Sequence, residues 1–193
     1  MHQTDFSAYL YLKEQTTPDA DAGFFWHDEA YKAFLNQPLD FPADLFRYIA
    51  YAYSGMYVPP VIIEYKKEEA DNIIYQLHKL RQGDMSVRSA LLDALVPMIS
   101  NSLVGSSRVL HLVAPDHAPL YDTHVHAGWR KLFTTKTEAG SSLPAVSSRV
   151  SNEHFLSFWD HFMAWKQACN QQDVTVTAYE LCERLHVFGK SGG

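Results

Sequence analysis

The sequence predicts an all-α, mostly helical protein. Along much of the chain, apolar residues recur at steps of three and four, which is the spacing of one face of an α-helix. Proline and glycine stand where these periodic runs begin and end, which is where helices tolerate them. The alternation of strand and helix patterns that marks an α/β protein is missing.

The composition is that of one globular domain. Of the 193 residues, 47% are hydrophobic and 20% are charged, a balance that excludes a disordered chain, a collagen and a coiled coil. A chain of this length buries enough apolar surface to form one core. We expect a single, bilobal domain over 1–193, with possible helical lobes at 1–85 and 86–193.

Three helices are expected in the middle of the chain. Ala43–Ser54 follows a proline that suits a first helical turn and stops at a glycine. Lys66–Arg81 carries isoleucine and leucine on one stripe and ends just before Gly83. Ser86–Leu103 repeats apolar residues at helical steps, with a kink expected at Pro97.

Four more helices are expected towards the C-terminus. They are Ser107–Val113, Asp122–Phe133, Asn152–Asn170 and Thr177–Phe188. The intervening segments are rich in turn-forming residues. They are the bridge Pro115–Pro119 and the loop Glu138–Ser151. Val61–Tyr65 could form a short strand, but it is so brief that an extended linker is preferred.

The charge balance argues against a protein that holds bulk duplex DNA. The net charge is −6, from 16 basic and 22 acidic residues, whereas such proteins usually carry an excess of positive charge. The middle third alone, residues 79–150, is basic. A local basic face there would use Lys79, Arg81, Arg88, Arg108, Arg130 and Lys131; solvated helix faces are the alternative.

The sequence favours the cytoplasm. No apolar stretch approaches the roughly 18 residues that cross a bilayer, and the first residues lack a secretion signal, so we expect no membrane partner. Two scattered cysteines, Cys169 and Cys182, suit a reducing compartment and read as small core residues. No glycine-rich nucleotide loop is present, and we expect no cofactor.

Asp122, His124 and His126 form one candidate metal site. The pattern is similar to the HxH signature of metal-dependent amidohydrolases, in which both histidines lie on one side of a strand. That family is built on a barrel of about 250 residues whose first strand carries the signature. Here the motif comes late in a shorter, helical chain without further strand-borne ligands, so we expect no metal.

The segment Leu103–His111, followed by a proline-rich bridge and by Asp122-Thr123-His124-Val125, resembles the helix-hairpin-helix DNA glycosylase superfamily. That superfamily includes endonuclease III-like and 8-oxoguanine glycosylase-like enzymes. More closely, Ser107–Leu112 and Pro119–Asp122 are similar to uncharacterised bacterial proteins of the same fold that have a degenerate active site. The likeness covers about residues 86–190 and extends to the final Leu185–Lys190.

This resemblance implies that Asp122 is the catalytic carboxylate. A carboxylate at a helix N-terminus stays ionised, and it can stabilise an oxocarbenium-like sugar or take a proton from water as a flipped base departs. The residues implied to contact nucleic acid or ligand are Gly105, Ser106, Ser107, Arg108, His117, Tyr121, His124, Trp129 and Arg130. The alternative for Asp122 is a helix cap.

Two departures from the family pattern bear on activity. The place of the lysine that forms a Schiff base holds Arg108 or Val109, and arginine cannot serve as that nucleophile. We therefore expect no lyase activity. The hairpin carries Val104 for proline and Ser107 for the second glycine, which reduces its ability to hold a phosphate.

For the aromatic and histidine candidates, a role in the core is the alternative to a functional role. The stripe Phe155, Phe158, Trp159, Phe162 and Trp165 has helical spacing and reads as core, although aromatic rings can also clasp a base. His111 reads as a core residue whose ring is hydrogen-bonded. His117 and His124 flank the expected cleft and are the better candidates for titration near neutral pH.

Three functions follow from these patterns. The first is a DNA glycosylase-like protein, either a monofunctional N-glycosidic hydrolase that uses Asp122 or a degenerate relative that binds nucleic acid. The second is a non-enzymatic module that binds a nucleotide or a protein on the same fold. The third and remotest is a metal-dependent hydrolase through Asp122, His124 and His126.

Overall fold

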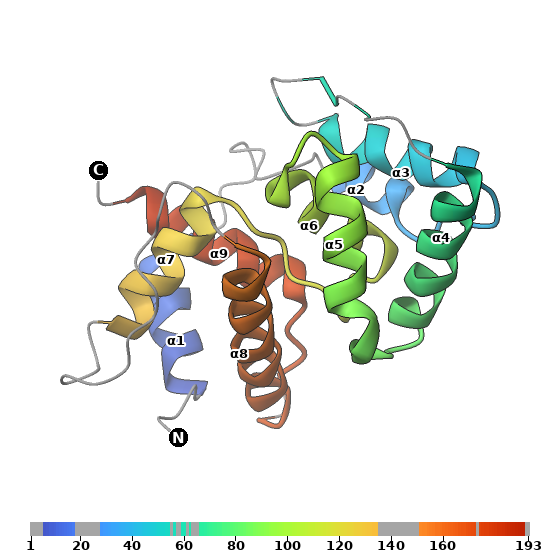
Figure 1. Ribbon diagram of the computed structural model, residues 1–193. Coiled ribbons are helices and arrows are strands. Elements are labelled where there is room, and N and C mark those ends of the chain that lie inside the picture. Colours follow the sequence, from blue (N-terminus) through green and yellow to red (C-terminus); the bar gives the residue numbers. More distant parts are fainter. Residues whose placement is uncertain are drawn as a thin grey trace. The chain divides into compact units, whose positions relative to one another are not determined.

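The structure, a computed structural model, describes residues 6–17, 28–54, 56, 59–60, 62, 66–134, 151–172 and 174–191. Within these ranges the chain forms nine α-helices and one short 3-10 helix, and no strand (Figure 1). The protein is therefore all-α, as the sequence predicts. Of the expected linker Val61–Tyr65, only Ile62 is described, and it forms an isolated antiparallel bridge with Ile99. The expected loop lies outside the described residues except for Ser151.

The chain divides into two compact units, which we describe one at a time. The first is discontinuous and combines residues 1–22 with 119–193, while the second is the continuous segment 23–118. This division differs from the expected lobes 1–85 and 86–193. The physical reason is that the first helix packs against the last two helices rather than against its neighbours in sequence.

The continuous unit holds five α-helices and the 3-10 helix. They are α2 (Asp28–Phe34), α3 (Pro42–Tyr53), α4 (Lys67–Arg81), η1 (Met85–Val87), α5 (Arg88–Met98) and α6 (Leu103–Val113). Helix α6 is its centre, because it packs against α3, α4 and α5 and is buried along almost its whole length. Its polar residues Ser106, Ser107, Arg108 and His111 are therefore buried along with its apolar ones.

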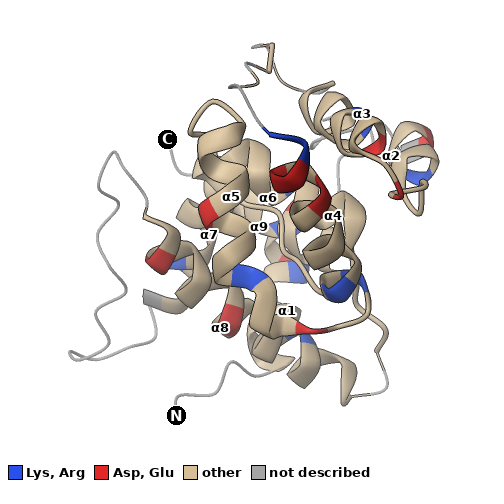
Figure 2. Cartoon of the chain, turned by 45° about the vertical axis from the view of Figure 1, so that its right-hand side comes forward, with Lys and Arg blue, Asp and Glu red and all other residues tan. Residues whose placement is uncertain are grey.

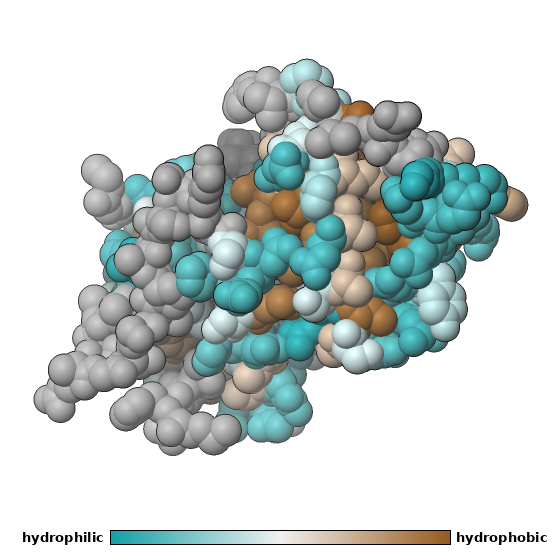
Figure 3. Space-filling model, in the orientation of Figure 1, coloured by the Kyte–Doolittle hydropathy of each residue, from teal (hydrophilic) through white to brown (hydrophobic). Residues whose placement is uncertain are grey.

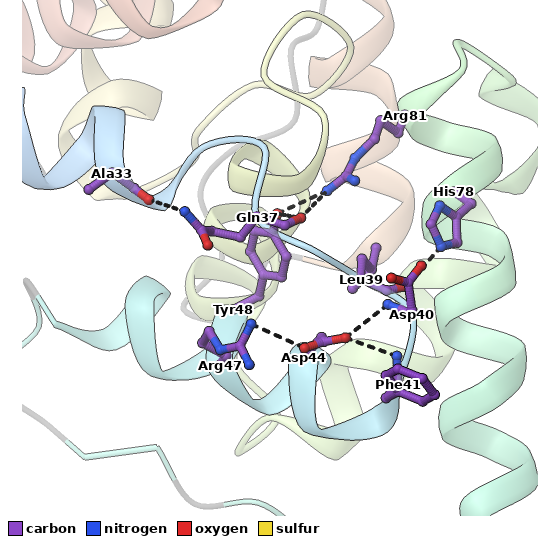
Figure 4. Close-up of polar contacts among 10 residues, drawn as sticks. All are labelled: Ala33, Gln37, Leu39, Asp40, Phe41, Asp44, Arg47, Tyr48, His78 and Arg81. Atoms are coloured by element: carbon purple, nitrogen blue, oxygen red, sulfur yellow. Dashed lines mark hydrogen bonds and ion pairs between the residues drawn. The ribbon is translucent and has the colours of Figure 1, made fainter.

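Arg81 ties three elements of the continuous unit together (Figure 4). Its Nη2 donates to the hydroxyl of Tyr48 on α3 at 2.9 Å and to the carbonyl of Gln37 at 3.4 Å, and its Nε donates to the carbonyl of Val113 at 3.0 Å. On the same helix, the ring Nε2 of His78 lies 2.8 Å from the carbonyl of Leu39. The polar side chains of α4 thereby fix the connection between α2 and α3.

The single expected helix over Ser86–Leu103 is instead three elements. Helix α5 ends at Met98, one residue beyond Pro97, which supplies no backbone N–H. Ser100 and Asn101 then adopt positive φ angles of 57° and 52°, which a helix does not accommodate. The side chain of Ser102 restarts the chain as α6 by accepting the N–H of Gly105 at 3.0 Å.

The discontinuous unit holds four helices. They are α1 (Phe6–Gln15), α7 (Thr123–Thr134), α8 (Asn152–Asn170) and α9 (Ala178–Lys190). Two of these helices begin at a side-chain N-cap: Ser151 caps α8 and Thr177 caps α9. The periodicity predicted α7, α8 and α9 to within two residues at each end, whereas α1 and α2 were not predicted.

Aromatic rings form the core of the discontinuous unit. Phe155, Phe158, Trp159, Phe162 and Trp165 of α8 are all buried, which confirms their interpretation as core. Trp129 of α7 packs among them, with its ring centroid 5.2 Å from that of Phe158 and 5.7 Å from that of Trp165. Edge-to-face pairs of this kind stabilise a core beyond the burial of their area.

Helices α7 and α9 cross with their backbones in direct contact. The crossing is made by Gly128 and Gly189. A Cβ at Gly128 would overlap the carbonyl of Leu185, and one at Gly189 would overlap the carbonyl of His124. Because glycine has no side chain, Gly128 can lie against the carbonyl of Leu185, one turn before Gly189. In the same way, Gly189 lies against the carbonyl of His124, one turn before Gly128. This close approach brings the start of α7 beside the middle of α9.

Figures 2 and 3 show how charge and hydropathy are distributed over the described residues in one view each. Basic and acidic residues are interspersed along the helices (Figure 2), and the face in Figure 3 mixes hydrophobic with hydrophilic residues. Of the large exposed apolar side chains, two are adjacent on α1 and the others lie elsewhere: Leu10, Tyr11, Phe41, Ile62 and Tyr75. Among the described helices, none has the length and apolar character needed to cross a bilayer.

Candidate functional site

Asp122 lies immediately before α7 and caps it. Its Oδ1 accepts the backbone N–H of Val125 at 2.7 Å, which is the bond that an N-cap side chain makes. The capping alternative from the sequence is therefore confirmed. A cap occupies one carboxylate oxygen, so the surroundings of the other oxygen decide what else Asp122 can do.

The second oxygen of Asp122 faces a histidine of α9. Nδ1 of His186 lies 2.8 Å from Oδ2, across 64 residues of sequence. Both side chains are largely buried, with 14% of the Asp122 side chain and 8% of the His186 side chain exposed. A helix cap needs no such partner, so this pair is the strongest chemical feature of the described residues.

The pair keeps Asp122 ionised. Burial alone raises the pKa of the Asp122 carboxyl, but the hydrogen bond and charge of His186, the N–H of Val125 and the charge of His124 outweigh it and hold the pKa below its usual 3.8. The N-terminus of α7 acts in the same direction, because its free N–H groups favour a negative charge. Asp122 is thus a carboxylate throughout the neutral range.

Three further side chains lie close to the pair: His124, Tyr121 and Cys182. The His124 ring meets the His186 ring edge to face, with centroids 4.9 Å apart, and His124 is exposed. Tyr121 is buried beside Asp122, and burial raises its pKa to about 12. Burial also raises the pKa of the Cys182 thiol, whose Sγ contacts the carbonyl of Leu120 at 3.5 Å.

The geometry of α7 removes the premise of the metal hypothesis. That hypothesis needs His124 and His126 on one side of a strand, whereas both lie in the first turn of a helix. Residues two apart in a helix point about 200° from each other. His126 accordingly packs against Tyr121, with ring centroids 5.6 Å apart, while His124 contacts His186. Across the described residues, no group of three His, Cys, Asp or Glu side chains could hold a metal ion.

Four of the residues implied to contact a phosphate lie inside the continuous unit. Gly105, Ser106, Ser107 and Arg108 belong to α6, and all four are buried. Gly105 lets the ring of Tyr53 lie against the helix, and Arg108 donates to the carbonyl of Ala52 at 3.3 Å. The sequence predicted a hairpin at this place. The structure shows a packed helix, because Ser102 caps α6 four residues earlier than the expected start.

The other candidates divide between the two units. His117 belongs to the continuous unit, where its half-buried ring lies against Gly83, whose φ is +89°. Trp129 is 2% exposed within the aromatic core. Arg130 is half-buried on α7. Burial, together with the charge of Arg130, lowers the pKa of His126.

His111 is confirmed as a core residue whose ring is hydrogen-bonded. It is fully buried, and Nδ1 lies 2.7 Å from the carbonyl of Ala118. A carbonyl only accepts, so Nδ1 carries the proton and the other ring nitrogen, Nε2, accepts from the hydroxyl of Tyr31 at 2.8 Å. The two rings also stack. His111 therefore has a structural role.

Sequence reasoning missed His186 as a site residue. It stands in an apolar segment of α9, and no local spacing connects it to Asp122. The sequence does hold one sign of this contact, the glycines Gly128 and Gly189. Two glycines predict a close helix crossing, but only when it is already known that α7 and α9 pack together.

Compared with protein-family models, with curated proteins and with solved structures, the chain gives no match. The likeness to DNA glycosylases therefore stays a prediction from the motifs quoted above. What the structure contributes independently is a buried, ionised carboxylate that is held by one hydrogen bond from its own helix and one from a second helix.

Proposed function

We propose that the protein hydrolyses an N-glycosidic bond in DNA or in a nucleotide, with Asp122 as the carboxylate of the site. The observation that supports this proposal is the pairing of an ionised, part-buried Asp122 with His186 at 2.8 Å. Helix capping explains one oxygen of Asp122 and leaves this second contact unexplained. The motif around Asp122 resembles that of DNA glycosylases, which points in the same direction.

The chemistry suits a fixed carboxylate. As the bond between C1′ and the base nitrogen breaks, the base takes the electron pair and positive charge develops on the sugar. A carboxylate beside the sugar stabilises that charge. Water then adds its oxygen to C1′, and its proton passes through the carboxylate to the departing base. The reaction needs no lysine, so it yields no Schiff base.

The proposal does not use residues 105–108, because they are buried in the continuous unit. Since these four residues were among those expected to contact nucleic acid, we include free nucleosides and nucleotides among the candidate substrates as well as oligonucleotides.

A direct test is base release by the wild type and by Asp122→Asn. The substitution keeps the shape and the capping ability of the side chain and removes the charge. We expect base release by the wild type and a loss on the order of 100-fold or more in the variant, the usual contribution of an acid–base group. Asp160→Asn, which removes an exposed charge from α8 of the same unit, is the matched control and should keep full activity.

A second candidate is a module that binds a nucleotide or a protein without chemistry. It is favoured by the hydrogen bond from Val125 to Asp122, since capping is a sufficient reason for an aspartate at this place. No base release from any substrate, with wild type and Asp122→Asn equally folded, would reject the hydrolase and leave this module. Calorimetric titration with nucleotides would then test it.

A further inference from the structure

Arg184 is a charged side chain of α9 that lies almost entirely inside the discontinuous unit, with 9% of the side chain exposed. Its Nε donates to Oε1 of Glu180 at 3.0 Å, one turn earlier on α9. Its Nη1 donates to the backbone carbonyl of Thr16 at 3.1 Å, just after the end of α1. A buried cation is costly unless such partners surround it. The guanidinium therefore joins α9 to the end of α1 across 168 residues of sequence.

Two hydroxyl groups complete this cluster from the side of α1. The hydroxyl of Tyr9 donates to the same Oε1 of Glu180 at 3.2 Å. The hydroxyl of Thr16 donates to the carbonyl of Leu12 at 2.6 Å, and Nη1 of Arg184 lies 3.4 Å from its oxygen. A cation at the end of a helix also suits the negative pole of the helix dipole. The cluster thus fixes both the end of α1 and the face of α9 that it meets.

Arg184 and His186 lie on opposite faces of α9. Residues two apart in a helix point about 200° from each other. Arg184 accordingly contacts the end of α1, whereas Nδ1 of His186 reaches Oδ2 of Asp122 at the start of α7. Helix α9 lies between α1 and α7, so a rotation of α9 that moved one of these side chains would move the other.

The glycine crossing sets the distance between α7 and α9 more firmly than the rotation of α9. Gly128 and Gly189 let the two backbones touch because they carry no side chains. For the same reason they offer nothing that interlocks with the facing helix, as side chains do in an ordinary helix pair. Contacts on the opposite face of α9 must then help to hold its orientation, and Arg184 supplies them from the end of α1.

We infer that Arg184 is a positioning residue of the Asp122 site: bound to the end of α1, it holds α9 in the orientation in which His186 meets Asp122. The inference rests on the buried guanidinium, on its contacts with two helices and on the opposite placement of His186. Arg184 takes no direct part in the chemistry, since it faces α1. Its effect on rate rests on the proposed function, whereas its effect on the geometry of the site does not.

The first test measures the site without any activity. The Asp122 carboxyl is titrated by ¹³C NMR in the wild type, in Arg184→Met and in Arg184→Lys. Burial raises the pKa of Asp122, and the hydrogen bond from His186 is the largest influence that lowers it. Losing that contact in Arg184→Met should therefore raise the midpoint by about one pH unit or more. Arg184→Lys keeps the charge without the planar fork of donors, so its midpoint should lie between the other two.

Two control variants separate positioning from a general loss of stability. Tyr9→Phe removes a hydroxyl from the same cluster and keeps the contacts of Arg184, so Asp122 should titrate as in the wild type. Leu77→Ala empties a buried site in the continuous unit and should also leave the midpoint unchanged. An Arg184→Met midpoint equal to those of the two controls would overturn the inference.

The second test measures base release. Because a displacement of about 1 Å can cost on the order of 100-fold in rate, kcat of Arg184→Met should fall about tenfold or more, with KM within about twofold of the wild type. Tyr9→Phe should keep both constants. A raised KM with an unchanged kcat would contradict the inference, since Arg184 would then serve substrate binding rather than the arrangement of the carboxylate.

The two tests distinguish a failure of the inference from a failure of the proposed function. A raised Asp122 midpoint in Arg184→Met, without base release by the wild type from any substrate, would reject the hydrolase and support the positioning role. Base release by the wild type, with an unchanged Asp122 midpoint in Arg184→Met, would do the reverse. Arg184→Met leaves the Glu180 carboxylate without its cation. If it fails to fold, the double variant that adds Glu180→Gln decides, because neither position then carries a charge.

Discussion

A carboxylate that caps a helix needs one hydrogen bond, and Asp122 accepts two, from different helices. Val125 satisfies Oδ1 from the first turn of α7, and His186 reaches Oδ2 from α9. The side chain is thus fixed in orientation as well as in charge. At the scale of single residues, this distinguishes Asp122 from an ordinary capping residue such as Ser151, which contacts only the helix that it starts.

The charge on Asp122 predicts how stability depends on pH. Its folded-state pKa lies below the usual 3.8, so the native state holds the ionised form more strongly than the unfolded chain does. The resulting stabilisation is complete above the unfolded pKa and is lost as the pH falls through the folded value. We expect urea unfolding to show a decline below about pH 4 that is reduced in Asp122→Asn. Identical declines in the two proteins would contradict this assignment.

At the scale of helices, the crossing of α7 and α9 positions the site. Gly128 and Gly189 let the two backbones touch, and His186 stands three residues before the second glycine. An ordinary helix pair, held 8–10 Å apart by side chains, would separate Asp122 from its partner. The glycines are therefore part of the site although neither carries a functional group.

We predict that Gly128→Ala destabilises the protein by about 1–3 kcal/mol or more, as overpacking does in a close-packed core. The added methyl would overlap the Leu185 carbonyl, which is backbone and cannot rotate away. Chemical denaturation measures this loss of stability. Ala127→Ser, at the adjacent exposed position, is the control and should stay within about 0.5 kcal/mol of the wild type. Equal stability of the two variants would refute the crossing.

Helices with a single apolar face were predictable from the sequence, and those without one were not. Helix α4 buries Ile73, Ile74 and Leu77 on one stripe, so its pattern is plain. Helix α1 buries Tyr9 and Leu12 but exposes Leu10 and Tyr11, which hides its period. Helix α2 has only seven residues, too few for two turns of pattern.

The same reasoning explains how much of the site was predictable. The capping role of Asp122 follows from a local rule and was anticipated. The burial of Arg108 and the partnership of His186 depend on which helices pack together, and that information is spread over many residues. Motif spacing therefore located the carboxylate, and only the tertiary structure supplied its partner.

At the scale of the whole molecule, the two units differ in how the chain builds them. The continuous unit is one segment, whereas the discontinuous unit joins α1 to helices more than a hundred residues later. Helix α1 contributes the fully buried Leu12, and Thr16, the residue just after the helix, accepts from Arg184 at its backbone carbonyl at 3.1 Å. The stability of the Asp122–His186 pair should thus depend on residues at the start of the chain.

A matched pair of cavity substitutions tests this division. Leu12→Ala and Leu77→Ala each empty a fully buried leucine site, one in each unit, and each should cost about 2–5 kcal/mol. We expect hydrogen exchange in Leu12→Ala to accelerate in α7, α8 and α9, and in Leu77→Ala to accelerate in α3, α4 and α6. Equal acceleration throughout the chain in both variants would mean that the protein opens as one cooperative body.

The discontinuous unit also sets an order of events during synthesis. A growing chain leaves the ribosome from its N-terminus, and domains fold as their segments become available. Residues 23–118 can fold while later segments are still being made, but α1 must wait for α8 and α9, the two helices that it packs against. Throughout that interval the apolar face of α1, with Tyr9 and Leu12, lacks the helices that cover it in the folded unit. The newly made chain thus exposes the apolar face of α1 until α8 and α9 have been synthesised.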